Sequence, residues 1–340
     1  MREKLLIVVI CCLSLIACKQ QRGFTVVQGS MLGTTLNVIS DRGDAGELYR
    51  NIMKIDSMMK GSMSIFDENS LLNRLNKNLT DSVDCHITRN LELAREISEL
   101  SDGYYDVTIR PLVEAWGFAG KQRIDSPNID SLIELVGYKK VRIENGRLIK
   151  EDKRIQLDFN SIAKGYTVDL VAEFLESIGA ENYLVDIGGE VRCKGHNREG
   201  KAWRIGVEKP IDNVIYGTTA EARISINDGA LATSGNYRRY FIGEDGVRVG
   251  HTINPHTGLS TLSRLLSTTV VAESCAEADA LATMYLSLGA ERALELAKST
   301  PNAKVLFILS RDRGEDVDRE SEQESEFEIY ISEAMQSLIL

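Results

Sequence analysis

Two oxygen-bearing side chains, Asp279 and Thr283, stand four residues apart in a stretch of mostly small apolar residues, 276–283. On a helix this spacing places both oxygens on one face. Carboxylate and hydroxyl oxygens are hard ligands that suit Mg²⁺ and are poor for zinc, and two protein ligands leave room for phosphates and water. The spacing alone favours a simpler interpretation, in which Asp279 interacts with the dipole of its helix and Thr283 bonds back to the helix backbone.

A second candidate is the segment 157–166, where an apolar strand runs into a turn and then into a helix. Such a junction presents backbone groups and a helix N-terminus, which together form an anion site. Lys164 could neutralise a phosphate there. Because the Ala-Lys-Gly sequence lacks the upstream glycine of a Walker loop, the motif of a nucleoside triphosphatase is absent. An equally good interpretation makes Lys164 a surface lysine and Asp158 a capping residue.

Two of the four histidines, His251 and His256, lie in the Pro/Gly turn 251–258. Histidine can act as a general base near neutral pH. A zinc site is a poor interpretation, since Pro255 forbids a regular helix between the two histidines and no third His or Cys is near in the sequence. The alternative is that both histidines cap or hydrogen-bond the turn.

Aromatic side chains follow a glycine at position 103 and could stack on a ring, although such residues are more often part of a core. They are Tyr104, Tyr105, Trp116 and Phe118. Ser234 stands in a Thr-Ser-Gly sequence rather than in G-x-S-x-G, so the sequence does not predict the nucleophile elbow of a serine hydrolase.

The N-terminus has the pattern of a secretory signal peptide. Basic residues precede the apolar run 5–16, which ends at Ala17 and Cys18 and is too short to cross a bilayer comfortably. The Leu-Ile-Ala-Cys ending resembles the bacterial lipobox, in which the cysteine is acylated and becomes the first residue. We therefore expect a signal peptide at 1–17 and a lipidated tether at 18–23. The alternative is an ordinary cleaved signal with an incidental cysteine.

The three cysteines that remain after the leader and the lipidated Cys18 are Cys85, Cys193 and Cys275. Three thiols cannot all pair, and their long spacing contains no C-x-x-C. We expect each to be a small buried residue with no metal or redox role.

The 340-residue chain has 43% hydrophobic and 26% charged residues, as expected for a globular protein, and a formal net charge of −10. Removing Arg2, Glu3 and Lys4 with the leader takes away one net positive charge and leaves −11. This negative charge argues against nucleic acid as a partner. An acidic stretch at 315–328 has no apolar period, and we expect a solvated loop or insertion at about 312–326.

Apolar periodicity predicts helices and strands in blocks rather than in strict βαβ alternation. Helices are expected at 47–60, 91–100, 167–178, 273–288 and 290–298. Strands are expected within 24–40 and at 154–159, 183–187, 203–207, 222–226, 268–272, 304–309 and 327–331. The blocks favour an α+β fold with mixed, largely antiparallel sheets and packed helices, forming one compact unit of one or two lobes at 24–340.

Taken in order, these segments resemble the FAD:protein FMN transferase family, the flavin transferases known as ApbE-like lipoproteins. The resemblance spans nearly all of the mature chain, and each piece is weak alone. The matching pieces are 33–34, 64–66, 70–76, 105–108, 111–112, 116–118, 158–169, 186–190, 233–237, 251–258 and 278–283. One departure is that the family usually has Met directly before the Gly-Thr pair, where this chain has Leu32 and carries Met31 one place earlier.

The resemblance implies roles for individual residues. Mg²⁺ would be bound by Asp279, Thr283 and the backbone carbonyl of Ser161, and His251 would be the base. The implied FAD site is lined by Leu32, Phe66, Tyr104, Tyr105, Asp106, Asp158, Lys164 and Ile253.

The implied reaction is attack of an acceptor hydroxyl on the FMN phosphorus of FAD, with release of AMP. Mg²⁺ and Lys164 would offset the developing negative charge. If water attacks instead, the same site is a Mg²⁺-dependent FAD pyrophosphatase that gives FMN and AMP. A noncatalytic alternative is a flavin-binding lipoprotein, but storage needs neither a metal pair nor a base.

The resemblance also implies partners and a location. The acceptor would be a redox protein outside the cytoplasm with a short Ser/Thr-containing flavinylation motif. Lipid on Cys18 would hold the enzyme to a bacterial membrane on its extracytoplasmic, periplasmic side.

Overall fold

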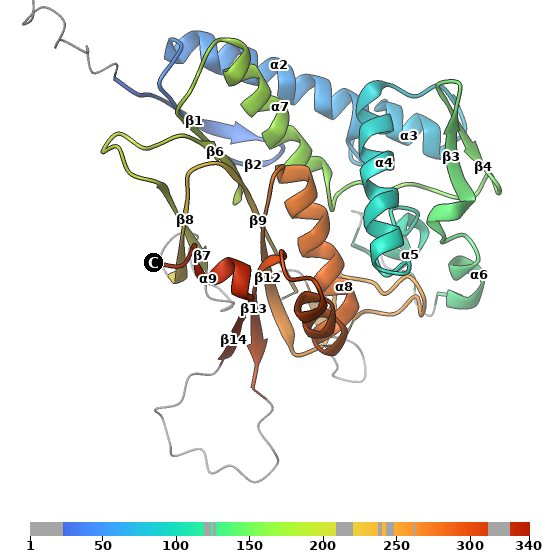
Figure 1. The fold of residues 1–340 in the computed structure, drawn as a ribbon. Helices are drawn as coiled ribbons and strands as arrows, with labels where there is room; N and C mark the ends of the chain where they lie inside the picture. The colour runs from blue at the N-terminus through green and yellow to red at the C-terminus, as the bar shows by residue number, and fades with distance from the viewer. Residues whose placement is uncertain are drawn as a thin grey trace, which may run out of the picture.

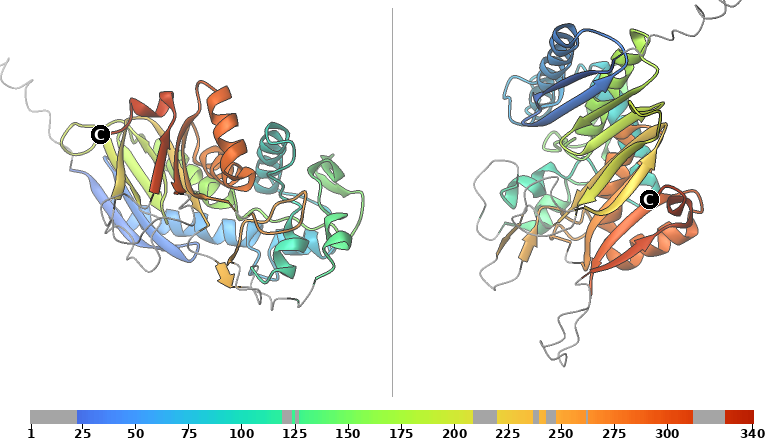
Figure 2. Two further views of the ribbon diagram at one scale, coloured as in Figure 1. Left: turned by 90° about the horizontal axis from the view of Figure 1, so that it is seen from below. Right: turned by 90° about the vertical axis from the view of Figure 1, so that its left-hand side faces the viewer.

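An antiparallel sheet of eight strands, in the order β1-β2-β5-β6-β9-β12-β13-β14, runs through the protein. The computed structural model describes residues 23–118, 124, 127–208, 220–236, 240–242, 248–261, 263–311 and 327–340. The predicted signal peptide, Cys18 and the loop expected at 312–326 lie outside these residues. Figure 2 shows the sheet strands succeeding one another from the blue β1–β2 hairpin to the red β14.

The strands are β1 (Thr25–Met31), β2 (Thr34–Ser40), β3 (Val141–Glu144), β4 (Arg147–Lys150), β5 (Tyr183–Ile187), β6 (Glu190–Lys194), β7 (Trp203–Glu208), β8 (Ala220–Ile226), β9 (Gly229–Gly235), β10 (Tyr240–Ile242), β11 (Arg248–Gly250), β12 (Leu265–Ala272), β13 (Lys304–Ser310) and β14 (Phe327–Ile331). The helices are α2 (Ala45–Met63), α3 (Leu71–Asn76), α4 (Cys85–Leu100), α5 (Arg110–Ala115), α6 (Ile129–Ile133), α7 (Ala163–Ser177), α8 (Cys275–Ser299) and α9 (Glu333–Gln336), with a 3₁₀ turn at Tyr138–Lys140.

The two faces of the large sheet bury different cores. On one face, α7 and α2 pack against β1, β2 and β5, and α8 packs against β9 and β12 (Figure 1). On the other face, the β7–β8 hairpin and the C-terminal segment cover β5, β6, β9 and β13. The predicted α+β class with antiparallel sheets is confirmed.

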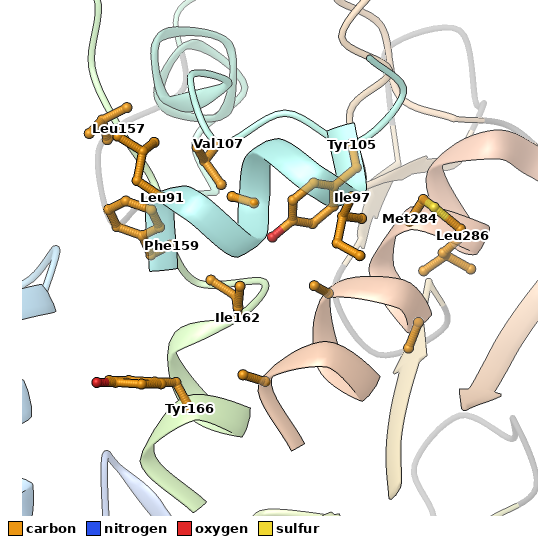
Figure 3. Packing of buried hydrophobic residues seen from close by; sticks show 14 of the residues in the cluster. Leu91, Ile97, Tyr105, Val107, Leu157, Phe159, Ile162, Tyr166, Met284 and Leu286 are labelled. Atoms are coloured by element: carbon orange, nitrogen blue, oxygen red, sulfur yellow. The ribbon is translucent and has the colours of Figure 1, made fainter. Parts of the chain in front are cut away.

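A third cluster extends from β12 and β13 across α8 to α4, α7 and the segment that leads into α7. Figure 3 shows Leu91 and Ile97 of α4 gathered with Tyr105, Ile162 and Met284. These side chains are all nearly inaccessible to solvent. The first turn of α7 and the middle of α8 are therefore set in a rigid core, which matters because both carry candidate site residues.

The predicted strand at 154–159 is wrong. This segment is extended but forms only one bridge, between Gln156 and Ile109. The side chain of Asn76 replaces a neighbouring strand, since its amide donates to the Leu157 carbonyl at 2.8 Å and accepts from the Leu157 N–H at 2.7 Å. A side-chain amide can satisfy a backbone pair in this way, and apolar alternation alone does not distinguish the two cases.

The predicted break between the two last long helices is confirmed at Gly289. The single element α8 spans both predicted helices, but Gly289 inside it has φ 76° and ψ 173°, so two helical segments meet there at a kink. The next backbone N–H, that of Ala290, donates to the Ser263 hydroxyl at 2.8 Å. Glycine is the residue that adopts this conformation without a steric penalty.

The cysteines differ from one another in their exposure. Cys193 and Cys275 are buried as expected, and burial raises the pKa of both thiols. Cys85 is exposed at the start of α4, so the expectation of burial is wrong for it. Among the described residues, no helix has both the length and the apolar character needed to cross a membrane.

Candidate active site

One cleft of about 1620 Å³ collects the site residues predicted from the sequence. It lies between the sheet, the first turn of α7, the middle of α8 and the 251–258 turn. All the predicted residues line its wall: Leu32, Phe66, Tyr104, Tyr105, Asp106, Asp158, Ser161, Lys164, His251, Ile253, Asp279 and Thr283. Residues from distant parts of the chain are therefore brought to one place.

Asp279 and Thr283 project from α8 into this cleft. Asp279 is 5% exposed and accepts a hydrogen bond from the Gly165 N–H at 3.0 Å. Burial raises the pKa of Asp279, against the opposing influence of Lys164 and of this hydrogen bond. The Thr283 hydroxyl lies 3.0 Å from the Ser234 hydroxyl of β9. Asp279 thus accepts a hydrogen bond from α7 and does not cap its own helix, whose N-terminus is capped by Ser274.

The N-terminal turns of α7 and α8 are held together by a pair of carboxylates. While Asp279 of α8 accepts from α7, Asp169 of α7 accepts from the Cys275 and Ala276 N–H groups of α8, each at 2.9 Å. Arg192 of β6 pairs with Asp169 at 2.7 Å. Each helix therefore supplies the acceptor that the other helix's N-terminus needs.

Lys164 pairs with a residue that the sequence did not single out as functional. Its ammonium nitrogen lies 2.5 Å from an oxygen of Glu190, whose side chain is 4% exposed. Burial raises the pKa of Glu190 to about 8, although Lys164 opposes the shift. For Lys164, burial lowers the pKa, but the charges of Glu190 and Asp279 outweigh that effect and its pKa is raised. Burial therefore makes Glu190 harder to ionise than a free glutamate, whereas its contact with Lys164 favours the charged lysine.

Ser161 and Tyr105 join the segment before α7 to the core. The Ser161 hydroxyl donates to the Tyr105 hydroxyl at 2.9 Å, and burial raises the pKa of Tyr105. Asp158 accepts from the Asn160 N–H at 2.8 Å, which forms a turn that leads into α7. Burial also raises the pKa of Asp158. These bonds hold the segment that leads into α7 on the cleft wall.

Asp106 has a structural task as well as a place on the cleft wall. One carboxylate oxygen accepts from the N–H and the hydroxyl of Thr108, at 2.8 and 2.6 Å. The other accepts from the Tyr138 N–H at 2.6 Å. Both oxygens are therefore engaged in fixing the loop.

Two apolar residues on the cleft wall are unusual, Phe66 in its high exposure and Leu32 in its backbone conformation. Phe66 is 74% exposed, on a loop tied by the Ser64 hydroxyl, which accepts from the Phe66 and Asp67 N–H groups at 3.1 Å each. Leu32 has φ 51° in the two-residue turn between β1 and β2, and its N–H donates to Asp56 at 3.0 Å. A leucine at positive φ is uncommon, and here the turn places it against the cleft.

The two histidines of the 251–258 turn have different surroundings. The His251 ring lies on the cleft wall, with its centroid 6.3 Å from that of Phe118 in an edge-on arrangement. His256 donates from its ring to the Asp102 carbonyl at 3.0 Å and lies 4.5 Å from the Tyr104 ring. His256 therefore ties the turn to the loop before α5, whereas His251 faces the cleft.

The donor set at Asp279 fits a hard divalent cation. It consists of one carboxylate, a threonine hydroxyl and the nearby Ser161 segment on one cleft, with Lys164 close enough to influence the Asp279 pKa. Within the part of the chain that the structure describes, no group of three or more His, Cys, Asp or Glu side chains could hold a metal. A cation here would need further oxygens from a ligand or water, as Mg²⁺ bound beside phosphates does.

The fold and the cleft define an α+β protein in which a large antiparallel sheet and the packed helices α7 and α8 border one large cleft. A family model gives the particular assignment: residues 32–307 match the ApbE family, and the chain belongs to that family.

Relatives of known name agree with this membership. The chain is 36% identical over 313 residues to the FAD:protein FMN transferase of Vibrio cholerae, which covers 89% of this chain and 92% of the relative. It is 36% identical over 326 residues to the enzyme of that name from Haemophilus influenzae, covering 91% and 93%.

Solved structures resemble the whole fold. The flavin transferase ApbE from Vibrio cholerae superposes with a TM-score of 0.79 at 33% identity, covering 93% of this chain and 99% of that one. The apo flavinyl transferase ApbE of Pseudomonas stutzeri superposes with a TM-score of 0.80 at 29% identity, covering 93% and 96%.

Proposed function

We propose that this protein transfers FMN from FAD to a serine or threonine hydroxyl of an acceptor protein and releases AMP. The observation that carries the proposal is the gathering of an oxygen ligand pair, a paired lysine and a histidine on one cleft large enough for a dinucleotide. The names of relatives that match about nine tenths of the chain support the same reaction.

In the proposed reaction, the acceptor oxygen forms a bond to the FMN phosphorus. The bond from that phosphorus to the bridging oxygen breaks, and AMP leaves with the electron pair. His251 takes the proton of the acceptor hydroxyl, since it lines the cleft. Lys164 stabilises the charge that develops on the phosphoryl oxygens.

A magnesium ion belongs to this proposal. Asp279, Thr283 and the Ser161 carbonyl would hold it, and when bound it would supply positive charge to the pyrophosphate oxygens. The protein's own contribution is to fix these donors: Gly165 orients the Asp279 carboxylate and Ser234 meets the Thr283 hydroxyl.

The flavin part of FAD is assigned to the rim and aromatic wall. Phe66, Leu32 and Ile253 offer apolar surface to the ring system, and Tyr104 and Tyr105 line the same wall with Asp106 and Asp158. Flat apolar and aromatic surfaces of this kind suit a planar ring.

The location is also a proposal. Cys18, at the end of the apolar leader, would be lipidated and would hold the enzyme to a bacterial membrane on its extracytoplasmic face. The acceptor would then be a redox protein exposed on the same face and carrying a Ser/Thr flavinylation motif.

The transfer can be tested by mass. The full chain is incubated with FAD, Mg²⁺ and a candidate acceptor, and the acceptor is weighed intact. Addition of one FMN, lost when the acceptor hydroxyl is replaced, supports the proposal. FMN and AMP formed with no adduct would indicate a pyrophosphatase, and FAD bound but unaltered would indicate a storage protein.

A further inference from the structure

The open edge of β7 forms one wall of the cleft. Five of its six residues line the cleft: Trp203, Arg204, Ile205, Gly206 and Glu208. Successive residues of a strand point to opposite faces, so a cleft that touches consecutive residues borders the strand's edge as well as a face. Among the described strands, β7 pairs with β8 alone, on its other edge.

The pairing of β7 with β8 fixes which backbone groups point into the open edge. Arg204 lies opposite Ser225, and the Ser225 N–H points away from β7 to donate to the Leu338 carbonyl at 2.7 Å. In an antiparallel pair, both members of such a position turn their backbone groups outward. Arg204 therefore directs its N–H and C=O away from β8, toward the open edge.

Gly206 has the same orientation. It lies opposite Arg223, whose carbonyl turns outward to accept from the Leu340 N–H at 2.9 Å. Arg204 and Gly206 are both exposed, and in the described residues neither has a backbone hydrogen bond at this edge. The outward N–H and C=O groups of these two alternate residues are therefore available to pair with another strand.

The floor beside this edge is the large sheet. Asn37 of β2 and Asp186 of β5, which lie opposite each other, line the cleft together with Ile39 and Leu184. These residues are distinct from the α7 and α8 residues assigned to the metal and the pyrophosphate. The whole cleft, about 1620 Å³, exceeds the roughly 300–1,000 Å³ typical of a small-molecule pocket.

We infer that an extended segment of the acceptor protein adds to β7 as a further strand, over the floor of β2 and β5. The inference rests on the proposed transfer reaction. The six residues of β7 would guide roughly 20 Å of acceptor backbone, and main-chain pairing would bind it with little demand on sequence. Continuity of this edge with the catalytic end of the cleft would bring the acceptor hydroxyl to the FMN phosphorus.

The test uses a proline at Gly206. Gly206→Pro removes the outward N–H, but it leaves the pairing with β8 intact, because this position donates no hydrogen bond to β8. We expect the KM for the acceptor to rise by about tenfold, with FAD affinity unchanged. Gly206→Ala retains the N–H and is the matched control, with a KM within about twofold of the unaltered enzyme.

A second measurement does not depend on the folding of a variant. Peptides copied from the segment of the acceptor that carries FMN, each with one backbone amide methylated, compete with the acceptor for the unaltered enzyme. Strand addition predicts weak competition at every second position, because only alternate amides face β7.

Two outcomes would contradict strand addition without contradicting the transfer reaction. Normal acceptor KM in a folded Gly206→Pro enzyme, or competition with no alternation, would exclude strand addition while transfer itself persists. If the unaltered enzyme transfers no FMN to any acceptor, the proposed function fails and this inference fails with it.

Discussion

The Asp279 carboxylate of α8 accepts a hydrogen bond from the Gly165 N–H of α7 at 3.0 Å, so the candidate metal ligand is held by a neighbouring helix. The contact depends on the absence of a side chain at Gly165. A Cβ added there would lie 2.2 Å from the Cys275 carbonyl oxygen and 2.9 Å from the Ala276 nitrogen, both of which are backbone atoms.

Gly165→Ala should therefore separate α7 from α8. We expect a loss of about 1–3 kcal/mol in the free energy of unfolding, measured with denaturant, and a large loss of FMN transfer. Gly61→Ala is the control, since Gly61 lies inside α2 with nothing within 4 Å of an added Cβ. It should leave stability unchanged or raise it by about 1 kcal/mol. Equal stability of the two variants would contradict the close crossing.

Asp279→Ala should abolish FMN transfer and its dependence on Mg²⁺. Loss of the charged ligand removes several kcal/mol of charge stabilisation, so turnover should fall by about a hundredfold or more, and Thr283→Val should have a milder effect. Glu277→Ala, two residues away on the same helix, should retain activity because Glu277 is not on the cleft wall. Titration of activity with Mg²⁺ is the measurement. Unchanged activity of the Asp279 variant at limiting Mg²⁺ would remove the metal assignment.

Local sequence patterns predicted several elements closely. The strand expected at 327–331 has those bounds, and the helix break expected at residue 289 occurs at Gly289. The apolar periodicity predicts the strand, and the glycine predicts the break in the helix. The β3–β4 hairpin was missed, although Asn145-Gly146, with φ 51° and 72°, is a strong signal for a two-residue turn.

Other features of the site depend on tertiary contacts that no local pattern contains. Glu190 follows a Gly-Gly turn and could be read as a polar residue at a strand start, yet it is buried against Lys164. Asp169 lies in the middle of α7 and caps α8, which no spacing along the chain indicates. The resemblance to a family placed the candidate residues, whereas their supporting partners became visible only in the fold.

Glu190 should make stability depend on pH. Its folded pKa of about 8 is above the ordinary value of 4.5, so the folded chain holds a proton that the unfolded chain releases. This contribution to stability is complete below pH 4.5 and is lost as the pH rises through about 8.

Glu190→Gln should remove the part of the pH dependence of stability that comes from Glu190. We expect the difference in the free energy of unfolding between the two proteins to change by about 4 kcal/mol between pH 5 and pH 9, in favour of the variant at the higher pH. Asp106, Asp158 and Asp279 titrate in both proteins, so the difference reports on Glu190 together with Lys164, which contacts it. The free energy of unfolding of both proteins is measured by denaturation at a series of pH values. If it changes with pH to the same extent in both, Glu190 is ionised throughout.

Cys18→Ala should release the protein from membranes. Two acyl chains give a lasting anchor, which the short apolar leader does not supply after cleavage. Carbonate washing followed by fractionation gives the measurement. A variant that is processed at the same place and still sediments with membranes would contradict the lipid anchor.

His251 should matter for turnover more than for FAD binding. His251 lines the cleft, and a base acts in the transition state, so His251→Ala should lower the rate of FMN transfer by about a hundredfold or more while FAD affinity changes little. Raising the pH should restore part of the rate, because hydroxide can then remove the acceptor proton. Single-turnover rates and FAD titrations at several pH values measure both effects.

His256→Ala is the matched control, since it changes the same residue type in the same turn. His256 bonds to the Asp102 carbonyl and lies against Tyr104, so its loss should loosen the turn and weaken FAD binding modestly without a change in the pH profile of the chemical step. A base and a structural residue thus differ in which constant they alter. If both variants lose turnover and FAD affinity to the same extent, and high pH rescues neither, the turn supports the cleft and His251 is not the base.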